Sequence, residues 1–299
     1  MNGRMKQIAL PLLTAMIWGS AFVAQKDGAE VLGPFGFTGA RYALAALALF
    51  GFLKARSRRT PAAERTTDRR ALLRNGLVLG TLIALGSTLQ QYGVERTTAG
   101  KAGFITALYI VLVPLLGLFF GNRVRIKVWC GVAVALAGLY FLSFAAGGAP
   151  AFNSGDVFVL LCTLAFSVHI LCVDRFTRTA DPVELSCAQF AVAAAETLAL
   201  ALIFEGLPLA DVARCMPFLL YTGVVSGALG YTLQIVAQKD GDPTVVSLLL
   251  SLESLFAVLS GALLLHERLT AREYLGCALM LCAVALVQLP DKKRVRELT

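Results

Sequence analysis

The sequence contains few charged residues. Asp, Glu, Lys and Arg make up 15% of its 299 residues, whereas apolar residues make up 57%. A soluble domain carries about 25% charged residues, so this chain lacks the side chains needed to cover a surface in water. The mean hydropathy of +0.72 also excludes disorder. We therefore predict an integral membrane protein whose partner is the lipid bilayer.

Recognisable enzyme motifs are also missing. The chain has no Gly-x-Ser-x-Gly elbow and no Gly-x-x-x-x-Gly-Lys phosphate loop. His266 and Glu267 begin like a zinc motif, but Thr270 stands where the second histidine ligand would be. There are only two histidines, and the seven cysteines form no Cys-x-x-Cys pair. We predict no enzyme activity, no catalytic residue, no metal and no cofactor.

Ten apolar runs are long enough to cross a bilayer, which takes about 20 helical residues. Each must be a helix, because unpaired backbone groups are not tolerated in hydrocarbon. The predicted spans are 6–25, 35–53, 72–93, 98–120, 125–143, 153–173, 182–204, 214–236, 243–265 and 271–289. We interpret the first run as a retained helix rather than a signal peptide, because its cleavage site is poor.

The distribution of basic residues predicts the orientation of these spans. Of the 27 Lys and Arg residues, 20 lie on the side of the N-terminus and six on the opposite side. Cations accumulate in cytoplasmic segments, so both termini are predicted to be cytoplasmic. The net charge of +8 is then explained by contact with anionic lipid. Nucleic-acid binding is not expected, because these basic segments have almost no interleaved aromatic residues.

The second half of the chain repeats the first. Ala84-Leu-Gly-Ser-Thr-Leu-Gln90 returns as Ala228-Leu-Gly-Tyr-Thr-Leu-Gln234, and Gly131 corresponds to Gly276. Several such blocks occur in the same order, which indicates a duplicated module. We place the two modules at 1–147 and 148–299. Each holds five spans, and because five is odd, the second copy enters the membrane upside down.

Inverted repeats of this kind are typical of secondary transporters. Two nearly equivalent halves can exchange conformations, which converts an outward-open state into an inward-open one. The predicted fold class is therefore an all-α integral membrane protein of ten transmembrane helices in two inverted five-helix repeats. The predicted function is a secondary-active transporter that moves a small molecule by alternating access.

Three ionisable residues lie inside predicted spans: Arg41, Glu196 and Glu253. Ionisable side chains at such depth are costly and usually face a cavity or a partner. Counting depth along the helices suggests that Arg41 is neutralised by Glu196 or Glu253, and the sequence does not choose between them. Such a pair is either purely structural or part of the transport site. In the second case, loss of water around Glu253 favours its neutral form, and it binds a proton during transport.

Other candidate residues line the predicted cavity. Gln90 and its repeat partner Gln234 lie near opposite faces of the membrane, where they are either gating residues or interfacial ones. Trp18 and Tyr109 are candidate aromatic lining. Pro114 is expected to kink the fourth span, because proline removes one helix hydrogen bond.

The order of several motifs resembles the drug/metabolite transporter superfamily, in its EamA-type branch of ten-helix transporters. The motifs are Trp18-Gly-Ser-Ala-Phe22, Ala40-Arg-Tyr42, Gly103-Phe-Ile-Thr-Ala-Leu-Tyr109, Val113-Pro-Leu115 and Leu252-Glu-Ser254, followed by 265–270 and Gly276. The resemblance covers nearly the whole chain. It implies a central cavity, a peripheral fifth helix in each repeat, and export of amino acids, other metabolites or toxic compounds.

Two positions depart from the pattern of that family. Ser254 stands where the family often has proline, so the ninth span is expected to be straighter. Asn122 stands where the first repeat often has glutamate, so the end of the fourth span lacks that carboxylate.

The alternatives to a transporter are a channel, an intramembrane enzyme and a scaffold. A channel would need a continuous polar stripe, and an intramembrane enzyme would need a nucleophile with its base or metal ligands at depth. A scaffold without transport activity is not excluded by the sequence, although inverted repeats would then serve no purpose. The sequence alone does not determine the substrate, any coupled proton or ion, or the oligomeric state.

Overall fold

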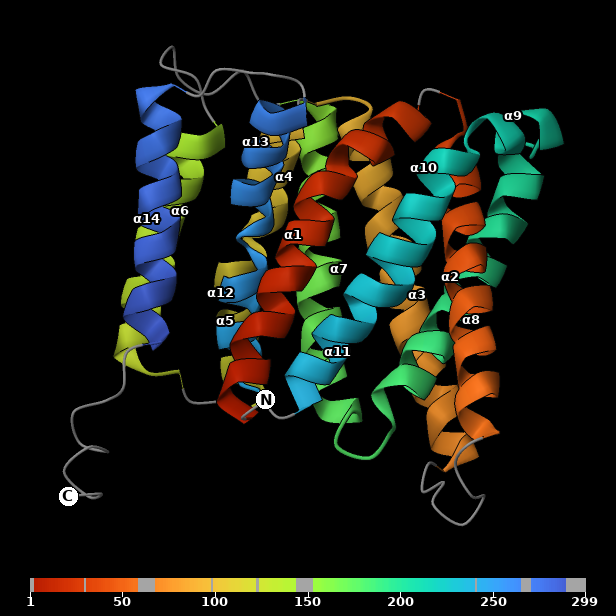
Figure 1. The fold of residues 1–299 in the computed structure, drawn as a ribbon, viewed down its shortest axis with the longest axis horizontal. Helices are drawn as coiled ribbons and strands as arrows, with labels where there is room; N and C mark the ends of the chain where they lie inside the picture. Colours follow the sequence, from red (N-terminus) through yellow and green to blue (C-terminus); the bar gives the residue numbers. More distant parts are fainter. Residues whose placement is uncertain are drawn as a thin grey trace.

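The computed structural model describes residues 3–29, 31–58, 68–97, 99–121, 124–143, 153–239, 241–264 and 270–288. Asn122, residues 265–269 with the incomplete zinc motif, and the basic segments 59–67 and 289–299 lie outside these ranges. Within them, every regular element is a helix (Figure 1).

The first repeat forms six helical segments: α1 (Gly3–Ala29), α2 (Pro34–Ser57), α3 (Arg69–Val94), α4 (Ala99–Ala107), α5 (Tyr109–Phe119) and α6 (Ile126–Ser143). The second repeat forms α7 (Ser154–Phe176), α8 (Pro182–Phe204), α9 (Leu209–Arg214), α10 (Met216–Leu220), the π-helix η2 (Tyr221–Tyr231), α11 (Thr232–Lys239), α12 (Pro243–Leu250), α13 (Glu253–Leu264) and α14 (Ala271–Gln288). The short helix α9 was not predicted.

The predicted spans are confirmed. In the described part of the chain, nine helical stretches are long and apolar enough to cross a membrane, and a tenth, shorter apolar helix covers 126–142. Three spans are assembled from consecutive segments: α4 with α5, α10 with η2 and α11, and α12 with α13. The ten-helix fold is therefore the observed one.

Helix starts follow from the local sequence. Asp68, Asp181 and Asp242 each accept hydrogen bonds from backbone N–H groups of the first helical turn, which satisfies donors that would otherwise be unpaired. Pro182 and Pro243 follow two of these caps directly. Proline fits the first turn of a helix, where no backbone donor is needed.

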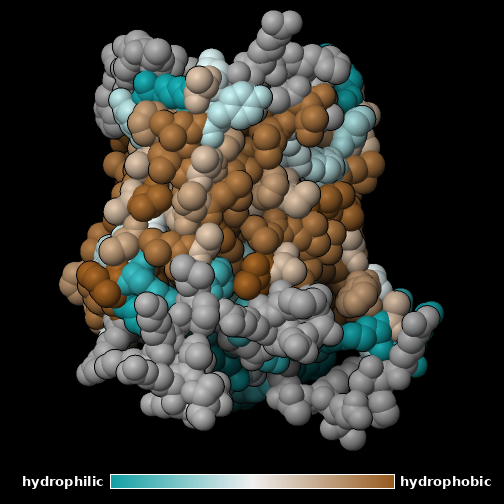
Figure 2. Space-filling view, turned by 60° about the vertical axis from the view of Figure 1, so that its left-hand side comes forward, coloured by the Kyte–Doolittle hydropathy of each residue, from teal (hydrophilic) through white to brown (hydrophobic). Residues whose placement is uncertain are grey.

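The outer surface of the bundle is apolar at mid-height. Figure 2 shows a broad hydrophobic band on one face, with hydrophilic residues above and below it. Large exposed apolar side chains include Phe50, Leu73, Phe119 and Leu202. Such a band suits a hydrocarbon environment and would be a liability in water. The surface therefore agrees with a protein that crosses the membrane many times.

The two repeats pack through equivalent helices. The fifth helices, α6 and α14, lie side by side at one edge of the bundle, and the second helices, α2 and α8, lie together at the other (Figure 1). In between, α3 packs on α7, and η2 with α11 packs on α1. Each contact has a counterpart in which the repeats change places. The start of α1 and the end of α14 lie on the same side of the bundle (Figure 1).

Small residues make the close contacts between these helices. A side chain added at Gly80 would meet Val192 of α8 at 2.5 Å, and one added at Gly223 would meet the Arg41 backbone oxygen of α2 at 2.5 Å. Small residues at such positions let helix backbones approach closely. They bring the walls of a central cavity together.

Candidate functional site

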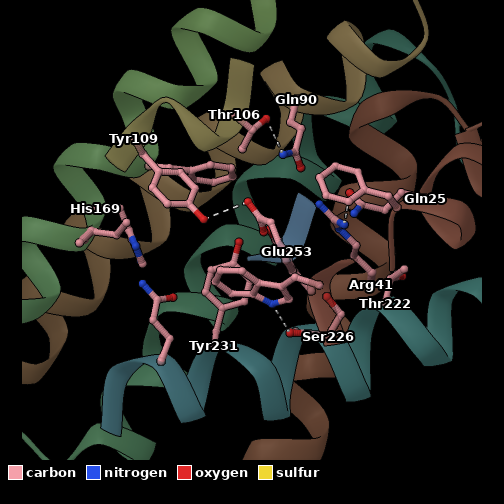
Figure 3. Close-up of a pocket in the computed structure, with 17 residues that line it drawn as sticks. Gln25, Arg41, Gln90, Thr106, Tyr109, His169, Thr222, Ser226, Tyr231 and Glu253 are labelled. Atoms are coloured by element: carbon pink, nitrogen blue, oxygen red, sulfur yellow. Dashed lines mark hydrogen bonds between the residues drawn. The ribbon is translucent and has the colours of Figure 1, made fainter. Parts of the chain in front are cut away.

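A cavity lies between the two repeats, at the centre of the bundle. Its volume is about 50 Å³, space for roughly three to five water molecules. Side chains from both repeats line it (Figure 3): Trp18, Phe22, Gln25, Arg41, Tyr42, Gln90, Thr106, Tyr109, Phe166, His169, Ile170, Thr222, Ser226, Gly227, Tyr231, Gln234 and Glu253. The wall is aromatic and carries one cation and one carboxyl group.

Two interrupted helices meet at this cavity. The fourth span breaks at Leu108, where the Leu108 N–H donates to the Ile105 carbonyl oxygen at 3.1 Å, a tighter turn than an α-helix makes. The ninth span breaks at Ser251 and Leu252 in the same way, with the Leu252 N–H donating to the Leu249 carbonyl oxygen at 3.3 Å. The two interruptions occupy equivalent positions of the repeats, at the offset that relates Gln90 to Gln234.

Each interruption is followed by a polar cavity residue. Tyr109 begins α5 and Glu253 begins α13, so these two residues are repeat partners. The Tyr109 hydroxyl donates to Glu253 Oε1 at 3.0 Å across the cavity (Figure 3). Both side chains are buried, with 3% and 4% exposed. The centre of the cavity therefore holds a hydrogen bond between equivalent positions of the two halves.

The fourth span is interrupted at a position that was not predicted. Helix α5 contains Pro114, where a kink was expected, and the interruption lies before it, at Leu108. The ninth span is not straighter, although Ser254 replaces proline, because α12 ends at Leu250 and α13 starts only at Glu253. A helix survives the loss of one hydrogen bond when its neighbours hold it in place, and tight packing can interrupt a helix without proline.

Arg41 does not form the predicted ion pair. Its Nη1 donates to Gln25 Oε1 at 2.9 Å, and its guanidinium lies near the rings of Phe37 and Tyr42, at 5.6 and 4.9 Å from their centroids. Among the ion pairs of the described residues, none includes Arg41. Arg41 is 5% exposed, so a charged group is buried without a carboxylate beside it.

Glu196 lies outside the cavity. Thr81 Oγ1 donates to Glu196 Oε1 at 2.7 Å, between α3 and α8. The prediction compared only the depths of Glu196 and Arg41 in the membrane. The Glu196 carboxylate faces Thr81 of α3 and not Arg41. Of the predicted site residues, the structure thus brings Arg41, Glu253, Trp18, Tyr109, Gln90 and Gln234 together and leaves Glu196 and Pro114 out.

The π-helix η2 forms one wall of the cavity. A π-helix bonds each N–H group one residue further back than an α-helix does, and the change of pattern frees carbonyl groups for other donors. Trp18 Nε1 donates to the Ser226 carbonyl oxygen at 3.1 Å, and Thr14 Oγ1 donates to that of Gly230 at 3.2 Å. The ring of Trp18 also lies against Tyr231, with centroids 4.6 Å apart. These contacts attach α1 to η2.

The two predicted glutamines both line the cavity. Gln90 Nε2 donates to Thr106 Oγ1 at 3.3 Å, within the first repeat. Gln234 Nε2 donates to Gln238 Oε1 at 2.9 Å, and Gln238 Nε2 in turn donates to the Ile170 carbonyl oxygen at 2.9 Å. Each glutamine therefore connects to a different helix of the wall.

Sequence reasoning missed several lining residues. Gln25 was not selected, although a polar residue inside an apolar span was the available signal. His169 was not selected either, yet its Nε2 lies 2.9 Å from Oε1 of the buried Gln189. Thr222 and Ser226 carried no signal, because hydroxyl residues are common in membrane helices and often bond to their own backbone.

The fold and the site together define a class. The described part of the chain holds nine membrane-length helical stretches and a shorter tenth helix, arranged as two inverted repeats with a polar cavity at their junction. This is the architecture of a membrane transporter. A sequence profile of the EamA-like transporter family matches residues 5–144 and again residues 153–289. The chain belongs to the EamA-like transporter family, within the drug/metabolite transporter superfamily.

Curated relatives agree with this membership. A protein of Archaeoglobus fulgidus named an uncharacterized transporter is 32% identical over 282 residues, which cover 93% of this chain and 84% of the relative. The uncharacterized inner membrane transporter YedA of Escherichia coli K12 is 26% identical over 299 residues, covering 96% and 93%. A crystal structure at 19% identity superimposes with a TM-score of 0.72 over 94% of this chain and 96% of that one, which supports the fold alone.

Proposed function

We propose that this protein is a secondary-active transporter that moves a small organic metabolite or drug by alternating access. The observation that carries the proposal is the position of the cavity, between two inverted repeats and beside two interrupted helices at equivalent positions. Interrupted helices at the repeat interface are typical of transporter binding sites. The relatives from Archaeoglobus fulgidus and Escherichia coli are named transporters.

Alternating access follows from the similarity of the two halves. Each half packs on the other through equivalent helices, so exchanging their conformations gives a second state of similar energy that is open on the opposite side. The cavity of about 50 Å³ holds roughly three to five water molecules and is too small for a metabolite. Substrate entry therefore requires α1, α13 and their equivalents to move apart.

Glu253 is the proposed site of proton coupling. It is buried and accepts one hydrogen bond, from Tyr109. An ionised carboxylate in such surroundings lacks the partners that would compensate for lost water. Burial therefore favours binding of a proton to Glu253, and substrate binding in the same cavity is coupled to that proton. We propose that a gradient drives any uphill transport, because the given sequence contains no Gly-x-x-x-x-Gly-Lys phosphate loop.

Localisation and direction complete the proposal. We place the protein in the inner or plasma membrane, with both termini in the cytoplasm because the N-terminal side carries most of the cations. Export is favoured by the family resemblance. Fluorescent or enzymatic tags on each terminus test the orientation: two cytoplasmic signals are expected, and a periplasmic or external signal at either end would contradict it.

The decisive experiment measures flux. Purified protein in liposomes is tested for uptake and counterflow of a metabolite and drug panel, with and without a pH gradient. Substrate-specific flux that saturates and shows counterflow is expected of a carrier. Discrete single-channel current, or no flux for any compound in either direction, would refute the proposal.

A further inference from the structure

Arg41 is a buried cation with unused hydrogen-bond donors. A guanidinium carries five N–H donors, but among the described residues Arg41 donates one hydrogen bond, to Gln25 Oε1 at 2.9 Å. Its Nε is buried without a partner. A buried charge without a counter-charge destabilises the folded state, so the position is costly unless a ligand uses it.

The fold does not require a cation at this position. Ala-Arg41-Tyr-Ala in the first repeat aligns with Ala-Gln189-Phe-Ala in the second, so Gln189 is the repeat partner of Arg41. Gln189 is neutral, fully buried and hydrogen-bonded to His169. The second repeat thus builds the same helix contact, α8 on α2, with an amide in place of the guanidinium. Neither helix packing nor the repeat symmetry therefore explains why position 41 carries a positive charge.

The surroundings of Arg41 form a cradle that opens on the cavity. The Arg41 guanidinium carbon lies 5.6 Å from the ring centroid of Phe37 and 4.9 Å from that of Tyr42. Arg41 and Gln25 both line the cavity (Figure 3). The Gln25 amide oxygen is a single neutral acceptor. A carboxylate offers two charged oxygens that match the guanidinium fork.

We propose that Arg41 binds the carboxylate of the transported molecule, which replaces the Gln25 amide oxygen as its acceptor. This inference rests on the proposed transport function and names the substrate class: a monocarboxylate with an apolar or aromatic body. The body lies against Trp18, Tyr231 and Phe22, which form the aromatic wall. A second carboxylate on the substrate is disfavoured when Glu253 is ionised, because two anions in the same cavity repel each other.

Binding can be measured with a single fluorescent reporter. The chain contains two tryptophans. Trp18 lines the cavity, and Trp129 lies in α6 at the edge of the bundle (Figure 1). A Trp129→Phe background leaves Trp18 as the only indole. Quenching is followed with matched probes: 3-phenylpropanoate against 3-phenylpropanamide, L-phenylalanine against L-phenylalaninamide, and hexanoate against hexanamide.

The acid of at least one pair is expected to bind about tenfold or more tightly than its amide, because charge-assisted bidentate bonds are roughly twice as strong as neutral ones. Arg41→Gln should abolish this preference, and Arg41→Lys, which keeps the charge but loses the fork, should reduce it. Gln25→Ala should preserve or strengthen it. Arg56→Gln is the matched control, because Arg56 lies on the same helix and pairs with Asp181 near the surface.

Three results would overturn the inference: no pair that prefers its acid, a preference that survives Arg41→Gln, or a preference that Gln25→Ala removes while the protein stays folded. Flux in liposomes separates this failure from failure of the proposed function. Transport of the amides without binding of the acids would leave the transporter intact and refute the role of Arg41. Binding of the acids that depends on Arg41, without flux of any compound, would support that role and refute transport.

Discussion

The two repeats pack through equivalent helices but differ in chemistry at the cavity. Tyr109 in the first repeat corresponds to Glu253 in the second, and Arg41 corresponds to Gln189. Positions that set helix contacts are kept, since Gly86 packs on the ring of Phe166 and its partner Gly230 packs on Trp18, the partner of Phe166. Symmetric contacts thus preserve the fold, while asymmetric polar residues are free to recognise an asymmetric substrate.

The third helix of each repeat shows a second difference. Helix α3 is α-helical from Arg69 to Val94, whereas its equivalent contains the π-helix η2. The Tyr42 hydroxyl pairs with Ser87 in the first repeat, and the equivalent pair, Phe190 and Tyr231, makes a ring contact at 5.5 Å instead. The tyrosine hydroxyl thus belongs to the second helix in the first repeat (Tyr42) and to the third helix in the second repeat (Tyr231 of η2). Tyr231 lines the cavity.

The largest expected effect is on the central pair. Among the described residues that line the cavity, Glu253 carries the only carboxyl group. Glu253→Gln removes it, so we expect transport to lose its pH dependence. Tyr109→Phe removes the hydrogen bond but keeps the carboxyl group, so a pH response should persist. Flux into liposomes at a series of pH values measures both. If Glu253→Gln transports with the pH profile of the unmodified protein, proton coupling at this residue is wrong.

Overpacking tests the preserved contacts. Gly86→Val places new atoms 2.6 Å from the Phe166 ring, and Gly230→Val places them 2.8 Å from Trp18 Nε1. Each should lower stability by about 1–3 kcal/mol or more, seen as a lower unfolding temperature in detergent. Gly51→Val is the control, because nothing lies within 4 Å of that position. Equal stability of all three variants would show that the repeats are not held by these contacts.

Trp18→Phe makes the first repeat resemble the second, in which Phe166 stands at this position. The change removes the hydrogen bond to the Ser226 carbonyl oxygen, which should cost about 0.5–1.5 kcal/mol. Thermal unfolding measures it. A Trp18→Phe protein as stable as the original would mean that α1 is attached to η2 by packing alone.

The smallest effect is expected at the ends of α2. Arg56 pairs with Asp181 at 3.1 Å, with 36% and 33% of the side chains exposed. At the other end, Glu205 accepts from the backbone N–H groups of Phe35 and Gly36. Arg56→Gln should lower stability by at most about 0.5–1 kcal/mol, since exposed ion pairs contribute little. Glu205→Ala should cost more, because it leaves helix donors without a partner. The reverse order in thermal unfolding would contradict this comparison.

Much of the fold was predictable because membrane insertion depends on length, composition and charge. The ten spans, the inverted repeat and the peripheral fifth helices are confirmed. The breaks at Leu108 and at Ser251 and Leu252 were not predicted, because leucine and serine both occur within continuous membrane helices. The glycines of η2 permit a π-helix, but nothing in their spacing demands one.

The candidate site was predictable in its residue types and only partly in its geometry. Counting along a span gives the depth of a side chain but not the direction it faces, which is why Glu196 was selected as a partner for Arg41 and Gln25 was overlooked. The sequence alone determined that two antiparallel five-helix units cross a bilayer, since hydrocarbon admits few alternatives. Only the tertiary structure decided that Tyr109 bonds to Glu253 and that Arg41 stands without a carboxylate, because these relations depend on how the helices rotate and pack.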